Sequence, residues 1–64
     1  MAIHLKAARV NAGYNQKQAA EKLNISKGTL ASYEKYKTIP DIETAKKIAD
    51  LYRLTVDDII FFAN

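Results

Sequence analysis

A chain of 64 residues, 48% of them hydrophobic, suits one small domain and leaves no room for a dinucleotide-binding fold, a barrel or a catalytic cleft between domains. It has no cysteine and one histidine, so we expect no disulfide, no metal site and no cofactor. The net charge of +3 is uneven: residues 1–37 carry seven basic and two acidic side chains, and residues 38–64 carry three basic and five acidic ones. This asymmetry predicts one face that meets an anion.

The first two predicted helices are short. One covers residues 3–12 and ends at Gly13, a residue type that is common just beyond a helix C-terminus. The other covers residues 16–23, where Asn15 is a good N-cap and Gln18 occupies the capping-box position. A helix of about two turns is marginal alone, so its stability must come from packing.

A turn separates the second predicted helix from the third. Asn24 tolerates the left-handed conformation that ends a helix, and Ser26 is expected to cap a third helix over residues 27–35. The inner face of that helix carries Leu30 and Tyr33, and its outer face is small, polar and basic at its start. Two short helices joined in this way are typical of a helix-turn-helix.

Pro40 and Asp41 mark the start of a fourth helix, because proline blocks continuation of the third and Asp41 is a good N-cap. The preceding residues 36–40 are predicted to form a loop, whereas the other connections between helices are short turns. The spacing predicts an amphipathic helix with one apolar stripe, made of Ile42, Ala45, Ile48, Ala49 and Tyr52.

Thr55 is expected to open a fifth helix, because Asp57 and Asp58 in its first turn would favour the helix dipole. Its predicted apolar positions are Val56, Ile59 and Ile60.

Residues 59–62 are all apolar, and a helix can bury only one face. We therefore expect Phe61 and Phe62 to stay near the surface, where two exposed phenylalanines indicate a partner surface. The interpretation is a homodimer interface built from Ile60, Phe61 and Phe62. The alternative is that both phenylalanines fold back onto their own domain.

An ordered set of residues runs along nearly the whole chain: Arg9, Gly13, Gln16, the run 20–23, Ile25, Ser26, Thr29, Leu30, Tyr33, Glu34, Pro40 and the run 57–60. With this set at this spacing, the chain resembles the lambda-repressor-like helix-turn-helix family of Cro/repressor and XRE-type proteins. The resemblance implies an all-α fold, a compact five-helix bundle in which residues 1–64 form a single DNA-binding domain. The second and third helices would be the DNA-binding pair.

The resemblance also implies that helix 27–35 enters the major groove with Lys27, Gly28 and Ser32 facing the bases. Lys27 can donate to guanine or to a phosphate, and Ser32 can donate or accept and so specifies weakly. Gly28 departs from the family, which usually has a side chain there. Either the helix approaches a base or a thymine methyl closely at that point, or Gly28 is an unselected surface residue.

Phosphate contacts are implied at the start of the second helix and around the third. The family uses Gln16 to bind a phosphate and to brace the recognition helix, and a helix N-terminus also presents N–H groups to an anion. Thr29 is interpreted as a phosphate or thymine-methyl contact, with a merely capped surface residue as the alternative. The expected phosphate set is Asn15, Gln16, Lys17, Thr29, Lys35, Tyr36, Lys37 and Thr38.

Two further departures from the family concern glycine. Tyr36 and Arg53 stand where the family favours glycine, and Tyr36 in a left-handed conformation would be mildly strained. The family also implies a structural salt bridge between Arg9 and Glu34 that sets the angle between helices, although an arginine on the first helix could instead contact DNA. His4 is expected to be a surface residue without a ligand role.

The predicted function is a sequence-specific regulator of transcription that binds double-stranded DNA, similar to a compact prophage or bacterial Cro/repressor-type protein. It would bind a pseudo-palindromic operator as a homodimer. The alternative is a protein-interaction module of the same fold, an antitoxin-like or anti-repressor partner with weak or no specific DNA binding.

Other classes of protein are not expected. The sequence shows no nucleophile–base pair, metal set or phosphate loop, so we predict neither an enzyme nor a small-molecule substrate. The longest apolar run is too short to span a membrane, and the N-terminus lacks a signal-peptide core. The expected location is the bacterial cytoplasm or nucleoid.

Overall fold

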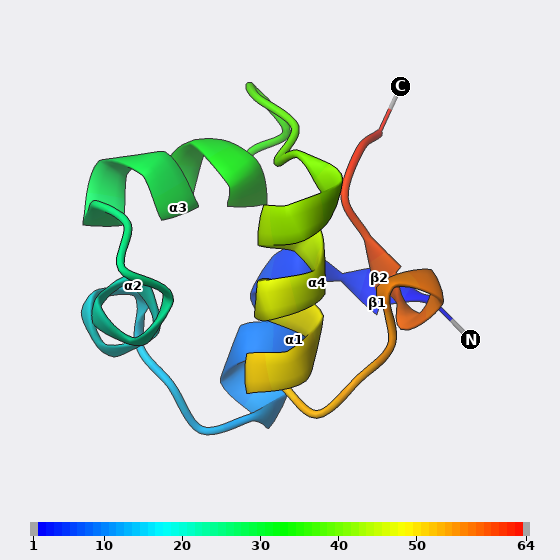
Figure 1. Ribbon diagram of the computed structural model, residues 1–64, viewed down its shortest axis with the longest axis horizontal. Coiled ribbons are helices and arrows are strands. Elements are labelled where there is room, and N and C mark those ends of the chain that lie inside the picture. Colours follow the sequence, from blue (N-terminus) through cyan, green and yellow to red (C-terminus); the bar gives the residue numbers. More distant parts are fainter. Residues whose placement is uncertain (1, 64) are drawn as a thin grey trace.

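The computed structural model describes residues 2–63, which form four α-helices, a 3₁₀ helix and two short strands (Figure 1). The all-α class is confirmed, but the expected five-helix count is wrong for the described residues. In chain order the elements are β1 (Ile3–His4), α1 (Leu5–Asn11), α2 (Gln16–Leu23), α3 (Lys27–Glu34), α4 (Ile42–Leu51), the 3₁₀ helix Val56–Asp58 and β2 (Ile59–Ile60).

All four α-helices end in the same motif, in which one residue adopts a left-handed conformation. These residues are Gly13, Asn24, Tyr36 and Arg53, with φ angles of 88°, 58°, 61° and 60°. The N–H of the next residue then donates to a carbonyl five residues earlier, as Lys37 N does to Ser32 O at 2.9 Å. The predicted helix ends at Gly13 and Asn24 are confirmed, as is the left-handed conformation of Tyr36.

The core draws one face from each helix. Leu5, Leu30 and Ile48 are completely buried at its centre. The stripe predicted for α4 is correct from Ala45 onward, but Ile42 is 62% exposed, so its assignment to the core was wrong. Ile42 is the first residue of α4, and the packed part of the helix begins one turn later. The other core residues are Ala8, Ala19, Ala20, Leu23, Ala45, Ala49, Tyr52, Ile59 and Phe61.

The two ends of the domain differ from the prediction because they pair with each other. Residues 3 and 4 are not the start of a helix, since α1 begins at Leu5 and the parallel register places Ile3 beside Ile59 and His4 beside Ile60. β-branched isoleucines favour this extended pairing. The third helix, expected to reach residue 35, ends at Glu34, a difference within the usual uncertainty of helix ends.

The predicted fifth helix is instead a single 3₁₀ turn. The Asp58 carboxylate accepts hydrogen bonds from the Thr55 N–H at 3.0 Å and from the Thr55 hydroxyl at 2.9 Å, which closes the turn locally. These two hydrogen bonds hold the pKa of Asp58 below its usual value. At Ile59 the backbone is already extended, with φ −121° and ψ 137°.

This extended ending overturns the expected exposure of Phe61. Successive side chains of an extended chain point to opposite sides, whereas the prediction assumed a helix. Ile59 and Phe61 therefore face inward, at 5% and 8% exposure, and Phe62 faces out at 66%. Only Phe62 of the two phenylalanines is available to a partner.

The helix pair and the strand pair lie on different sides of the domain. In Figure 1, α2 and α3 are seen on the left, whereas β1, β2 and both ends of the described chain are on the right. Within residues 2–63 no helix is long and apolar enough to cross a bilayer.

Candidate nucleic-acid interface

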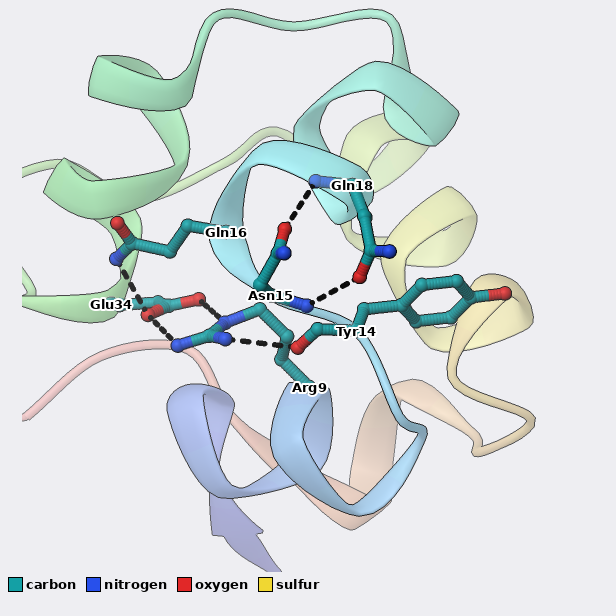
Figure 2. Close-up of polar contacts among 6 residues, drawn as sticks. All are labelled: Arg9, Tyr14, Asn15, Gln16, Gln18 and Glu34. Carbon is teal, nitrogen blue, oxygen red and sulfur yellow. Dashed lines mark hydrogen bonds and ion pairs between the residues drawn. The ribbon is translucent and has the colours of Figure 1, made fainter.

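The N-terminus of α2 is held in place by a reciprocal capping box. The Asn15 side chain accepts from the Gln18 N–H at 2.7 Å, and the Gln18 side chain accepts from the Asn15 N–H at 3.0 Å (Figure 2). Both bonds are local, which is why the sequence alone predicted them. They leave the remaining N–H groups of the first turn directed out of the helix, toward any anion placed there.

A buried ion pair connects α1 to α3 (Figure 2). Arg9 Nε donates to Glu34 Oε2 at 2.8 Å, and Arg9 Nη2 donates to Glu34 Oε1 at 3.2 Å, so the contact is bidentate. The side chains are only 9% and 3% exposed. Arg9 Nη1 also donates to the carbonyl of Tyr14 at 2.9 Å, which ties in the loop that leads to α2. The charge of Arg9 is therefore used inside the domain.

Gln16 extends this network to the first residue of α2. Its Nε2 atom donates to Glu34 Oε1 at 3.1 Å, so the bracing contact with α3 that the family resemblance implied is present (Figure 2). A side-chain amide carries two N–H bonds, and this contact uses one of them. The second remains available to an acceptor outside the domain. One carboxylate thus orients α1, α2 and α3 relative to one another.

The start of α3 is capped as predicted. The Ser26 hydroxyl accepts from the Thr29 N–H at 3.0 Å. It also lies 2.8 Å from the Thr29 hydroxyl, so that the two hydroxyls share a hydrogen bond. Thr29 is half-buried and is a capped residue in the isolated domain. Its methyl group and the hydrogen-bonding capacity of its hydroxyl that Ser26 does not use are left for a phosphate or a base.

The three predicted base-reading residues differ in exposure. Lys27 and Gly28 are exposed, and Ser32 is half-buried one turn further along α3. A Cβ atom added at Gly28 would meet only the Ser26 hydroxyl, at 3.9 Å, an ordinary contact distance. Packing within the domain therefore does not require glycine at this position, and both earlier explanations of Gly28 remain.

A basic groove of about 510 Å³ lies where α1, α2 and α3 approach one another. Lys6, Lys17 and Lys27 line it, one from each helix, and no carboxylate is among the residues that form its wall. Sequence reasoning did not assign Lys6 to the site. No local signal marks it, because only the packing of α1 against the helix pair brings it to the groove. The remaining lining residues are Arg9, Asn15 and Gln16.

The loop after α3 continues the basic surface. Lys35, Lys37 and Thr38 are exposed, whereas Tyr36 is half-buried. The hydroxyl of Tyr36 is hydrogen-bonded to Nδ1 of His4 in β1, and the two rings lie 5.8 Å apart at an angle of 57°. Sequence reasoning missed this contact, since it joins residues that are 32 positions apart.

Tyr52 lies near the ion pair. Its ring packs on that of Tyr14 with centroids 6.3 Å apart, and its hydroxyl has no hydrogen-bond partner within the described part of the chain. Burial raises the pKa of Tyr52 to about 12, and the negative charge of Glu34 adds to this shift, whereas Arg9 opposes it. Tyr52 is therefore a neutral core residue, as predicted.

The candidate dimer residues lie elsewhere. Ile60, in β2, is half-buried, and Phe62 follows it on the exposed side of the chain. β2, which contains Ile60, lies away from α2 in Figure 1. A partner bound there would leave the basic groove open.

Residues 5–59 match the helix-turn-helix family, and this range includes the α2–α3 pair and the Arg9–Glu34 ion pair that orients it. The chain belongs to the helix-turn-helix family. A similar protein is the HTH-type transcriptional regulator ImmR of Bacillus subtilis (strain 168), 46% identical over 56 residues. The aligned region covers 88% of this chain and 44% of that protein, so the chain spans less than half of its relative's length. No solved structure matches the chain.

Both findings point to a helix-turn-helix domain, and the relative itself is a transcriptional regulator.

Proposed function

We propose that this helix-turn-helix domain binds double-stranded DNA sequence-specifically and regulates transcription, with α3 in the major groove and α2 across the backbone. The observation that carries the proposal is the basic groove, where lysines from three helices gather beside the N-terminus of α2. A helix N-terminus and lysines supply the donors that position a protein on phosphates.

The base-reading side chains are Lys27 and Ser32, with Gly28 offering only backbone at the same face. Phosphates on either side of that contact would be held by the capped start of α2 and by the loop after α3. Lys6 joins this phosphate set because it lines the same groove as Lys17. The full phosphate set is Lys6, Asn15, Gln16, Lys17, Thr29, Lys35, Lys37 and Thr38. Tyr36, which was expected in this set, uses its N–H on the Tyr33 carbonyl and its hydroxyl on His4, so it supports the loop and does not itself bind phosphate in this proposal.

The domain acts as a homodimer through Ile60 and Phe62 in this proposal. Phe62 is 66% exposed and Ile60 precedes it by two residues, on the strand side of the domain. A two-fold dimer reads a pseudo-palindromic operator with half-sites about 10 bp, or roughly 34 Å, apart. Such a regulator resembles compact Cro-type or prophage proteins in its DNA-binding part.

The competing proposal is a protein-interaction module of the same fold. It is favoured by the exposed apolar side chains of Ile39, Ile42 and Phe62, which are each more than 60% exposed. Strong preference for one operator over random DNA would decide against it, because an interaction module needs no base readout.

Selection of bound sequences from random duplex DNA tests the main proposal. We expect Lys27→Ala and Ser32→Ala to change the selected sequence, because these side chains would face base edges. We expect Lys6→Ala to weaken binding to all sequences by a similar factor and to reduce the salt dependence by about one phosphate contact.

Lys46→Ala is the matched control, since Lys46 is an exposed lysine of α4 outside the groove. The proposal fails if both recognition-helix variants select the same sequence as the unmodified domain, or if Lys46→Ala weakens binding as much as Lys6→Ala does. Sizing of the complex on the selected sequence then tests the dimer.

A further inference from the structure

Tyr36 is an unusual residue for its position. It ends α3 with φ 61°, a conformation in which a tyrosine costs free energy relative to glycine. Two backbone hydrogen bonds hold the conformation, from Tyr36 N to Tyr33 O at 3.1 Å and from Lys37 N to Ser32 O at 2.9 Å. Glycine would satisfy both equally well, so the backbone does not explain the tyrosine.

The side chain of Tyr36 supplies the missing reason. Its hydroxyl is hydrogen-bonded to His4, and the two aromatic rings are tilted against each other at a centroid separation of 5.8 Å. Glycine at position 36 would lose this contact entirely. The contact joins the C-terminal end of α3 to β1, whereas the Arg9–Glu34 pair, two residues earlier in the chain, joins α3 to α1.

His4 is itself held by the strand pair. β1 and β2 are parallel, with His4 beside Ile60, and α1 begins at the residue after His4. Its backbone is therefore fixed on both sides, although its side chain is exposed. A residue with a fixed backbone and an exposed imidazole can act as a stationary anchor for a loop that packs beside it.

We infer that His4 is a positioning residue for DNA binding: through its hydrogen bond to Tyr36, it holds the loop of residues 35–38 in the conformation that contacts phosphates. This inference rests on the proposed function for the role of the loop. Lys35, Lys37 and Thr38 are exposed on either side of Tyr36, so anchoring one ring orders the backbone that carries all three. His4 does this without contacting DNA itself.

A double-mutant cycle with His4→Ala and Tyr36→Phe tests the inference on the selected operator. Tyr36→Phe removes only the hydroxyl and keeps the ring and the helix end. We expect each variant to lower operator affinity by about threefold to tenfold, the range that the net free energy of one hydrogen bond corresponds to. The double variant should bind no more weakly than either single one, because both remove the same contact.

Three further measurements separate positioning from other roles. The salt dependence of binding should be unchanged in His4→Ala, since no phosphate contact is lost. His4→Gln, which keeps a hydrogen-bonding side chain, should recover affinity, and the Lys37 amide should exchange faster with solvent in His4→Ala without DNA. Tyr14→Phe removes a hydroxyl of the same kind elsewhere and should leave affinity unchanged.

Independent, multiplying effects of the two substitutions, or unchanged affinity in both, would overturn the inference. A smaller salt dependence in His4→Ala would also overturn it, because His4 would then contact phosphate directly. If the unmodified domain selects no operator, the proposed function fails, and a Lys37 amide exchange rate unaffected by His4→Ala would show separately that the anchor fails as well.

Discussion

Arg9 and Glu34 form a buried ion pair whose charges are satisfied by hydrogen bonds within the domain. Burying two opposite charges is favourable only when the geometry supplies enough hydrogen bonds to replace water. Here the guanidinium donates to both carboxylate oxygens and to the Tyr14 carbonyl, and Gln16 donates to the carboxylate as well. A planar, multiply donating group is needed for this arrangement, and a lysine ammonium does not match it.

We expect Arg9→Lys to lower the free energy of unfolding by about 2–3 kcal/mol, because lysine keeps the charge but loses the bidentate contact and the Tyr14 contact. Urea denaturation measures the loss. Arg53→Lys is the control, since Arg53 is exposed and its replacement should cost less than about 0.5 kcal/mol. Equal losses in the two variants would show that the Arg9 geometry contributes nothing.

At Tyr52 a substitution should raise the free energy of unfolding instead of lowering it. Its hydroxyl is buried without a hydrogen-bond partner in residues 2–63, which costs stability. Tyr52→Phe keeps the ring and removes the hydroxyl, so the free energy of unfolding should rise by about 1 kcal/mol. A loss of stability would mean that the hydroxyl is paired in solution.

The stability gained by Tyr52→Phe relative to the unmodified domain should depend on pH. The folded-state pKa of Tyr52 is raised to about 12, above its ordinary value of 10.0. The neutral phenol is thus favoured by folding, and its contribution is fully present below pH 10 and is lost as pH rises from 10 toward 12. The stability difference between Tyr52→Phe and the unmodified domain should therefore widen over that range in chemical denaturation.

At the scale of elements, the helices are defined mainly by their ends. Each of the four α-helices stops at a left-handed residue, and α2, α3 and α4 begin at a side chain that caps an N–H of the first turn. For α4 the Thr44 N–H donates to Asp41 at 2.8 Å, which holds the pKa of Asp41 below its usual value. Such signals are local, so α2 to α4 could be predicted to within about a residue.

The elements at the two chain ends could not be predicted in this way. In a short apolar pattern, Ile3 and Ile59 are compatible with either a strand or a helix. The strands form because these two residues, distant in the chain, pair with each other. The predicted fifth helix failed for this reason, and with it the expected exposure of Phe61.

Arg53 follows α4 in a left-handed conformation, with φ 60°, which is unfavourable for a residue with a Cβ atom. Arg53→Gly relieves that cost but gives the unfolded chain more freedom, so we expect a net gain of about 0.5–1 kcal/mol. Asn24→Gly should change the free energy of unfolding by no more than about a few tenths of a kcal/mol, because asparagine tolerates the same conformation. Thermal unfolding of both variants checks the ranking, which a destabilised Arg53→Gly would refute.

In the whole molecule, the basic residues of the first part of the chain gather on one side of the domain. The basic groove and the loop after α3 come from residues 1–38, which contain most of the lysines. The apolar side chain of Phe62 lies on the strand side, beyond β2. In the proposed regulator the basic groove and the strand side are therefore different surfaces, and the loop after α3 adjoins the strand side through the His4–Tyr36 hydrogen bond.

Phe61 and Phe62 should respond differently to truncation. Phe61→Ala opens a cavity in the core and should cost about 3–4 kcal/mol of stability. Phe62→Ala should leave the stability of the monomer within about 0.5 kcal/mol but weaken the proposed dimer. Sedimentation velocity with and without operator DNA measures the latter. A dimer that survives Phe62→Ala would place the interface on another surface.

The sequence by itself determined the helix-turn-helix, because that motif is encoded by caps, turn residues and apolar spacing within a few positions of one another. It also identified Arg9 and Glu34 as partners through the family resemblance. Only the tertiary structure decided the pairing of β1 with β2, the inward turn of Phe61, the place of Lys6 in the groove and the hydrogen bond of His4 to Tyr36. Each of these joins or arranges segments that are distant in the chain, and packing, which no local pattern records, selects among the alternatives that the residues allow.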